Sequence, residues 1–81
     1  MDGRLGILIV EDDLIQTKAL ETVLKSLNQV ILGTARSGEL AIELVVDLIP
    51  DIIFMDIALT KDMNGIVATQ KINKISDAAI F

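Results

Sequence analysis

The sequence predicts an α/β fold, in which a parallel β-sheet carries helices on both of its faces. Short apolar runs occur without alternation, which is typical of strands buried on both faces of a parallel sheet. Segments with helical periodicity separate these runs. Alternation of strands and helices is characteristic of βαβ units. The expected order is βαβαβαβ in a single domain.

The first strand is expected over residues 5–10, where the apolar run Ile7-Leu8-Ile9-Val10 stops at Glu11-Asp12-Asp13. A helix is expected next, with Asp13 as its N-cap and Gln16 completing a capping box. Residues that recur at helical spacing form its apolar stripe: Leu14, Ile15, Ala19, Leu20, Val23, Leu24 and Leu27.

A second strand is expected over residues 30–35, and Ser37-Gly38 opens a second helix. The buried face of this helix is predicted to comprise Leu40, Ala41, Leu44, Val45 and Leu48. Pro50 ends the helix, because a proline disfavours helical geometry in the residue before it. A third strand over residues 52–55 is again apolar without alternation, and it is stopped by Asp56.

Residues 58–65 are expected to form a loop, since Asn64-Gly65 is a strong turn signal. A third helix is predicted over residues 66–75, with one side formed by Ile66, Thr69, Ile72 and Ile75. Ser76-Asp77 interrupts it, and residues 78–81 have the character of a fourth strand.

The composition excludes several classes of function. The 81 residues include no histidine and no cysteine, so Ser-His-Asp catalysis, Cys-His catalysis and thiolate metal sites are excluded. Aromatic residues make up 2% of the chain and the net charge is −5, which argues against direct nucleic-acid binding. Acidic residues interrupt each apolar run that could span a membrane, and no signal-peptide pattern is present. We therefore expect a cytoplasmic protein without a membrane partner.

Acidic side chains follow the first and third predicted strands. Because parallel strands end at the same edge of a sheet, Glu11, Asp12 and Asp56 are expected to meet there if the two strands are neighbours. An all-oxygen cluster of this kind suits Mg²⁺, which is usually shared with a phosphate. Acids after strands also serve as helix N-caps, and Asp13 is assigned that structural role. The joint placement of the other three favours the functional interpretation.

Several motifs resemble those of one known family, the response-regulator receiver domains. The stretch from Ile7 to Asp13 is similar to the opening of these domains, and the stretch from Pro50 to Ile57 is similar to their phosphorylation strand. Asn64-Gly65-Ile66 resembles the turn into their third helix, and Ser37-Gly38-Glu39-Leu40-Ala41 the start of their second. The matches occur in the right order from about Arg4 to Phe81.

The resemblance implies a flavodoxin-like (CheY-like) fold and a role in two-component signal transduction. Asp56 would accept a phosphoryl group from a histidine kinase or a phosphotransfer protein. Asp12 would ligate Mg²⁺ directly, and Glu11 would do so directly or through water. Asp56 and the backbone carbonyl of Ala58 would complete the protein ligands. Phosphoryl transfer mainly requires positioning and charge neutralisation, which a carboxylate nucleophile and Mg²⁺ supply.

The chain departs from the family pattern in two respects. The loop after Asp56 is one residue longer than the commonest form; Thr60, where proline is frequent, is interpreted as an ordinary loop residue, and Lys61 as solvent-facing. The sequence also stops at Phe81, before the hydroxyl residue, the fifth strand and the lysine that the resemblance implies. Residues 1–81 would thus be the N-terminal portion of a receiver domain, with an incomplete fold.

Two alternatives remain beside this non-enzymatic signalling module. One is a protein-interaction module, a receiver that lacks the parts needed to hold a phosphoryl group. The other is a Mg²⁺-dependent phosphatase with an aspartyl nucleophile. Such enzymes carry a second aspartate two residues after the nucleophile, and that position is Ala58 here.

A bare sheet edge invites pairing with another chain. We therefore expect this form of the protein to make a homo-oligomer or a strand-swapped dimer through the edge of the fourth strand.

Overall fold

The computed structural model describes residues 4–59 and 63–81, so the interpretations of Thr60 and Lys61 lie outside the described residues. Strands and helices alternate along the chain in the predicted order. The elements are β1 (Gly6–Val10), α1 (Leu14–Ser26), β2 (Val30–Ala35), α2 (Gly38–Leu48), β3 (Ile52–Met55), α3 (Gly65–Asn73) and β4 (Ala79–Ile80).

The four strands form one parallel sheet in the order β2-β1-β3-β4. Strand β1 lies between β2 and β3, with Ile7 opposite Ile52 and Val10 opposite Met55. The chain moves outward from β1 to β2 and then crosses to the other side of β1 to form β3. The order of the strands therefore changes direction between β1 and β3, the position where open α/β sheets bind ligands.

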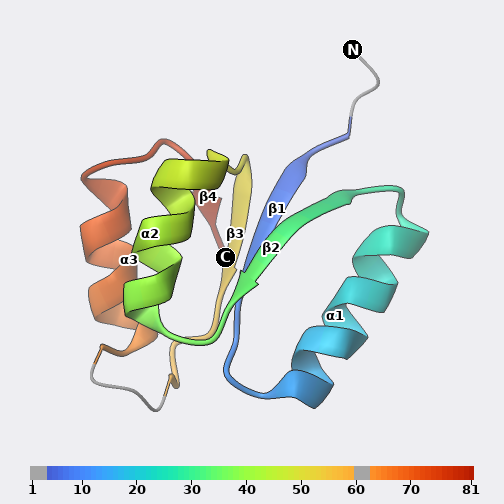
Figure 1. Cartoon of the computed structure of the whole chain (residues 1–81), viewed down its shortest axis with the longest axis horizontal. Helices are drawn as coiled ribbons and strands as arrows, with labels where there is room; N and C mark the ends of the chain where they lie inside the picture. Colours follow the sequence, from blue (N-terminus) through green and yellow to red (C-terminus); the bar gives the residue numbers. More distant parts are fainter. Residues whose placement is uncertain (1–3, 60–62) are drawn as a thin grey trace.

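Helices cover the two faces unequally (Figure 1). Helix α1 lies on one face, and α2 and α3 lie on the other. The α2–α3 side holds the larger core, formed by Leu8, Val10, Ala35, Ala41, Val45, Ile53, Met55, Leu59, Ala68 and Ile72. The α1 side has a smaller cluster of Ile7, Ile9 and Leu24, with four partly buried neighbours. The predicted fold class is confirmed, including helices on both faces.

Strands β1 and β3, which are both apolar without alternation in the sequence, differ in burial. Residues Ile7 to Val10 are all buried, as expected for a strand covered on both faces. In β3, only Ile53 and Met55 are buried, whereas Ile52 and Phe54 are half-buried. The prediction that β3 is buried on both faces was therefore wrong. The reason is that the single helix α1 packs over β1 and β2 and leaves the β3–β4 half of its face without a helix.

The predicted apolar stripe of α1 is only partly buried. Of the stripe, Leu24 is buried and Leu20 packs against the smaller cluster. The other buried residue of the helix is Thr17, which was not part of the predicted stripe. The remaining stripe residues are exposed: Leu14, Ile15, Ala19, Val23 and Leu27. The expected stripe is wider than the contact that one helix makes with two strands, so its outer residues face solvent.

The ends of the helices largely follow the predicted signals. Asp13 caps α1, accepting hydrogen bonds from the N–H groups of Ile15 (2.8 Å) and Gln16 (3.4 Å). The prediction that Gln16 completes the capping box was wrong, because the Asp13 N–H donates to Glu11 Oε2 at 3.1 Å instead. Ser37 caps α2 as expected, with its hydroxyl oxygen accepting from the N–H of Leu40.

Two predicted helix faces need correction. In α2, Ala41 and Val45 are buried as expected, but Leu40 is exposed. The third helix is shorter than predicted, and Ile66 and Ile75 are exposed. Its buried face consists of Gly65, Ala68 and Ile72. Ala68 packs against Gly38 at the start of α2, and Gly65 packs against the backbone of Asp56 and Ile57. Among residues 4–59 and 63–81, no helix has the length and apolar content needed to span a lipid bilayer.

Candidate functional site

Backbone hydrogen bonds fix the positions of two of the three predicted acids, Asp56 and Glu11. The N–H of Asp56 donates to the carbonyl of Val10 at 3.0 Å, and the N–H of Glu11 donates to the carbonyl of Ala35 at 2.9 Å. The sheet ladder thus continues one residue past β3 and one residue past β1. Asp56 and Glu11 are held on adjacent strands at the same edge, as the parallel topology requires.

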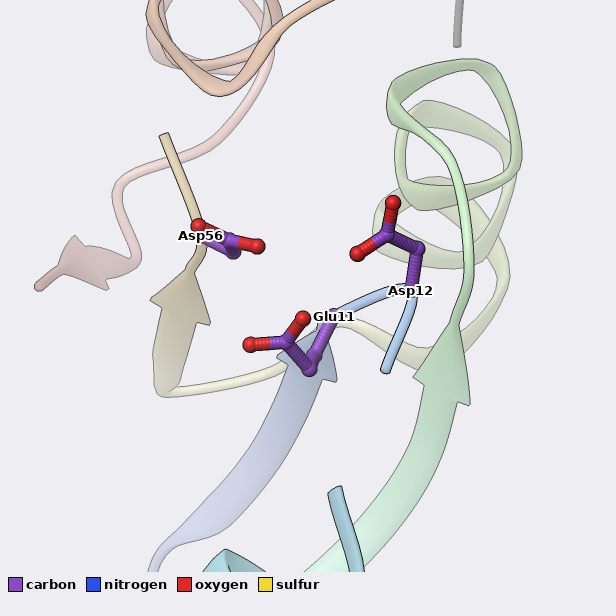
Figure 2. A group of neighbouring side chains, drawn as sticks. All are labelled: Glu11, Asp12 and Asp56. Atoms are coloured by element: carbon purple, nitrogen blue, oxygen red, sulfur yellow. The ribbon is translucent and has the colours of Figure 1, made fainter. Parts of the chain in front are cut away.

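The three carboxylates converge on one space at the ends of β1 and β3 (Figure 2). One oxygen from each of Glu11, Asp12 and Asp56 lies within 4.8 Å of the others, and all three residues are half-buried. The structure therefore brings together every acid that the sequence proposed for the site.

Local hydrogen bonds orient two of these carboxylates. Asp56 Oδ1 accepts a hydrogen bond from the N–H of Ala58 at 2.9 Å, which closes an Asx-turn just after the strand. Glu11 Oε2 accepts from the N–H of Asp13 at 3.1 Å. In each residue this backbone bond engages one of the two carboxylate oxygens.

The close approach of the acids changes the electrostatics of Glu11. Desolvation raises the pKa of Glu11 above its ordinary value of 4.5, and the neighbouring Asp56 and Asp12 carboxylates raise it further. The hydrogen bond from the Asp13 backbone opposes this shift in part. Like charges held together in this way favour a bound proton or a bound cation.

The donor set fits a magnesium ion. Mg²⁺ prefers oxygen ligands at about 2.0–2.1 Å, so two of its ligands are at most about 4.2 Å apart. The carboxylate oxygens lie within 4.8 Å of one another, so small rotations of the side chains are enough to reach that spacing. Magnesium usually keeps several waters and takes only one or two carboxylates directly, which agrees with half-buried side chains open to solvent.

Gly65 lies against the backbone of the site. A Cβ atom at this position would lie 2.3 Å from the carbonyl oxygen of Asp56 and 2.5 Å from the Cα of Ile57. Only a residue without a side chain lets α3 begin so close to the end of β3. The sequence marked Asn64-Gly65 as a turn, but the structure shows that close packing on Asp56 is what requires the glycine.

Two features of the site were missed from the sequence. One is the hydrogen bond from the Ala58 N–H, because Ala58 was considered only for its carbonyl. Its signal is an aspartate two residues before, the spacing of an Asx-turn. The other is the packing of Gly65 on Asp56, for which the Asn-Gly pair gives the position but not the reason. The carbonyl of Ala58 as a metal ligand stays a prediction.

The family model described as "Response regulator receiver domain" matches residues 7–80. Chemotaxis protein CheY of Thermotoga maritima is 36% identical over 73 residues, covering 90% of this chain and 60% of the relative. Transcriptional regulatory protein YdfI of Bacillus subtilis is 35% identical over 76 residues, covering 93% and 35%.

A third relative, which carries a different name, matches a similar length of this chain. A protein-glutamate methylesterase/protein-glutamine glutaminase of Methanococcus maripaludis is 41% identical over 71 residues, or 86% of this chain and 19% of the relative. The chain thus spans between a fifth and three fifths of these curated relatives.

Solved structures agree with the sequence comparisons. The signal receiver domain of a modulated diguanylate cyclase from Desulfovibrio desulfuricans superposes with a TM-score of 0.89 at 32% identity. This match covers 95% of the present chain and 62% of the solved chain. The receiver domain of the PhyR response regulator from Erythrobacter litoralis gives the same TM-score at 32% identity, covering 98% and 61%. The chain therefore belongs to the response regulator receiver domain family.

Proposed function

We propose that this chain is a phosphoacceptor module of two-component signal transduction, with Asp56 as the residue that takes the phosphoryl group. The observation that carries the proposal is the convergence of Glu11, Asp12 and Asp56 at the ends of adjacent parallel strands. Family membership supports it, since the same chain segment is matched by the receiver domain model.

In the proposed reaction, a carboxylate oxygen of Asp56 attacks the phosphorus of a phosphohistidine. A new P–O bond forms, the P–N bond breaks, and the electron pair stays on the departing imidazole nitrogen, which takes up a proton. The Ala58 N–H holds Oδ1 of Asp56, so Oδ2 is the oxygen available for attack. The donor of the phosphoryl group is a sensor histidine kinase or a phosphotransfer protein.

Glu11, Asp12 and Asp56 would hold Mg²⁺, with the carbonyl of Ala58 as a further ligand. When bound, the ion neutralises charge on the acids and on the incoming phosphoryl group. Without that compensation, a dianionic phosphoryl group would approach three clustered carboxylates and be repelled.

The relatives differ in the output that their names describe: methyl-ester and amide hydrolysis, transcriptional regulation and chemotaxis. The part shared with them is the receiver portion. We therefore propose a role for the receiver chemistry alone, outside the nucleic-acid-binding and enzymatic parts of such proteins. The cytoplasmic location stays a prediction.

The test is phosphorylation by a small donor. The chain is incubated with acetyl phosphate and Mg²⁺, and its intact mass is recorded. We expect a single phosphoryl adduct that disappears when Mg²⁺ is chelated and in Asp56→Asn. Asp47→Asn is the matched control, because Asp47 is an exposed aspartate on α2, and it should be phosphorylated like the unchanged chain.

Two outcomes would decide against the proposal. If Asp56→Asn is modified as much as the unchanged chain, Asp56 is not the acceptor. If the folded chain binds Mg²⁺ but gains no adduct, the protein-interaction module becomes the better interpretation.

A further inference from the structure

An asparagine–glycine pair, Asn64-Gly65, lies at the start of α3. The other two asparagines of the chain have larger neighbours, since Asn28 is followed by glutamine and Asn73 by lysine. All three asparagines are exposed to solvent. A backbone nitrogen approaches the amide of the preceding asparagine most easily when its own residue has no Cβ. Exposure does not distinguish the three asparagines, but the following residue does.

The hydrogen bonds around this pair favour attack of the Gly65 nitrogen on the Asn64 amide. The Val67 N–H donates to Asn64 Oδ1 at 3.0 Å. Negative charge develops on this oxygen when a nucleophile adds to Cγ, and an N–H group at a helix N-terminus stabilises that charge. The nucleophile is weakly held, because the Gly65 N–H donates to the carbonyl of Ile57 at 3.4 Å, a long bond for these atoms.

The packing of the first turn of α3 opposes the same attack. Asn64 has an extended backbone with ψ 172°. A five-membered ring requires its Cβ and the next nitrogen to be nearly eclipsed, so the peptide plane before Gly65 has to rotate. That plane lies against β3, because a Cβ on Gly65 would be 2.3 Å from the carbonyl oxygen of Asp56. One turn along, Ala68 packs against Gly38 of α2. Rotation therefore requires the first turn of α3 to detach.

We propose that Asn64 is a site of spontaneous deamidation and that the packing of α3 controls its rate. The Gly65 nitrogen attacks Cγ of Asn64, a new C–N bond forms, and the Cγ–Nδ2 bond breaks. The leaving nitrogen takes up the proton that the Gly65 nitrogen loses and departs as ammonia. Water then adds to one of the two carbonyl carbons of the cyclic imide, and the ring opens to an aspartate or an isoaspartate. Local opening of the first turn of α3 permits the first step.

The two products differ in their effect on the fold. An aspartate at position 64 keeps an oxygen for the Val67 N–H, and its negative charge is favourable at the N-terminus of α3. An isoaspartate continues the chain through the former side chain, which inserts one methylene group into the backbone directly before Gly65. Gly65 then loses its close fit against the backbone of Asp56. We expect the aspartate form to resemble the unchanged chain and the isoaspartate form to be less stable.

The first experiment locates the modification and measures its rate. The chain is incubated in mildly alkaline buffer with and without guanidinium chloride, and its digested peptides are analysed by chromatography and mass spectrometry. In the unfolded chain, deamidation at Asn64 should be about tenfold or more faster than at Asn28 and Asn73. In the folded chain, the rate at Asn64 should fall by about tenfold or more. Equal rates at the three asparagines of the unfolded chain would overturn the site, and equal rates in the two states would overturn control by α3.

A pair of variants tests whether the local packing of α3 is responsible. Ala68→Gly removes the methyl group that packs on Gly38 and loosens the helix, so deamidation of the folded chain should be about fivefold faster. Ala19→Gly is the matched control, because it makes the same change at an exposed position of α1. It should leave the rate at Asn64 unchanged. Equal acceleration in both variants would show that global unfolding exposes the pair, against the proposed role of α3.

The second experiment compares the products. The isoaspartate form is separated from aged protein, and Asn64→Asp is the reference for the aspartate form. We expect the isoaspartate form to unfold at a lower guanidinium concentration than the unchanged chain, and Asn64→Asp to match that chain. Equal midpoints for all three would overturn the predicted loss of packing.

Phosphorylation by acetyl phosphate should also be slower in the isoaspartate form, a readout that rests on the proposed function. If the unchanged chain gains no phosphoryl adduct, the proposed function fails, whereas the peptide analysis still decides the deamidation. An isoaspartate form that is phosphorylated as fast as the unchanged chain would show that the methylene inserted before Gly65 does not disturb Asp56.

Discussion

Three consecutive acids have different surroundings although they are neighbours in the sequence. Asp13 is a helix cap, and its carboxylate is occupied by the N–H groups of Ile15 and Gln16. Asp12 and Glu11 turn toward Asp56 and form the candidate site. Glu11 also supports the start of α1 through the Asp13 N–H. A one-residue difference along the chain thus separates a structural acid from the site acids.

The Gly65 position gives a prediction at this scale. Gly65→Ala is expected to lower the free energy of unfolding by about 1–3 kcal/mol, because overpacking against fixed backbone forces a shift. The added methyl group would meet the backbone of Asp56 and Ile57. The loop that carries Asp56 would move, so phosphorylation by acetyl phosphate should also slow. Urea denaturation and intact mass measure the two effects.

Gly33→Ala is the control for this variant. There the added methyl group would meet the end of the Leu48 side chain at 3.0 Å, and that side chain can rotate away. Equal losses of stability in the two variants would show that the Asp56 backbone can adjust and that Gly65 is not required for close packing.

At the scale of elements, the N-termini of the helices are well capped, whereas the C-terminus of one helix is strained. All three helices have a polar N-cap: Asp13, Ser37 and Asn64. Helix α2 ends at Ile49, which has φ 49° and ψ 63° in the left-handed region. A β-branched residue is strained in this conformation, where glycine or asparagine is usual. Pro50 follows and prevents the helix from continuing.

Ile49→Gly is therefore expected to stabilise the protein by up to about 1 kcal/mol. The substitution relieves the strain of the left-handed conformation, and the greater flexibility of glycine in the unfolded chain offsets part of this gain. Little packing is lost, because Ile49 is 79% exposed. The measurement is the urea midpoint at constant m-value.

Asn28 provides the opposite test, because it has φ 61° and a side chain that tolerates this region. Asn28→Ala should destabilise the protein where Ile49→Gly stabilises it. A loss of stability in Ile49→Gly would show that the left-handed residue is not a source of strain.

On the scale of the whole molecule, the two sides of the sheet differ in how completely they are covered. Two helices and a ten-residue buried cluster lie on one side, and one helix and a three-residue buried cluster lie on the other. Most of the stabilising apolar burial is thus on the α2–α3 side. An apolar groove lined by α1, Phe54 and Phe81 lies on the less covered side, and Glu11 and Asp56 also line it.

Stability should depend on pH through the acidic cluster. The pKa of Glu11 in the folded, metal-free chain is above its ordinary value of 4.5, so the folded state binds this proton more tightly than the unfolded state. The stabilisation that comes from protonated Glu11 is fully present below about pH 4.5. It is lost as the pH rises through the pKa of Glu11 in the folded state. We expect Glu11→Gln, which cannot ionise, to match the unchanged chain at low pH and to be more stable above this window.

The difference in the free energy of unfolding between Glu11→Gln and the unchanged chain is expected to stay below about 1 kcal/mol, because a half-buried site is screened by solvent. Urea midpoints from about pH 4 to pH 7 in the presence of a chelator measure it. If Glu11→Gln is less stable than the unchanged chain by the same amount at every pH, repulsion within the cluster is not significant. Glutamine keeps an oxygen for the Asp13 N–H, so the support of α1 is retained.

The sequence by itself determined the order of the elements, the parallel sheet and the three acids of the site. Those features depend on local signals: apolar runs without alternation, Asp13 and Ser37 as caps, Pro50 as a stop, and acids at strand ends. The carboxyl ends of parallel strands share one edge, so the sequence predicted that Glu11 and Asp56 would meet if their strands were neighbours. The structure supplied that condition, because β1 pairs with β3.

Only the tertiary structure decided which apolar residues are buried. Ile53 and Phe54 are adjacent and equally apolar, yet one lies in the larger core and the other beside the groove. Ile15 fits the stripe of α1 but is exposed, because burial depends on what lies opposite a side chain and not on its periodicity. The need for glycine at position 65 has the same origin, since it comes from the Asp56 backbone that folding places beside it.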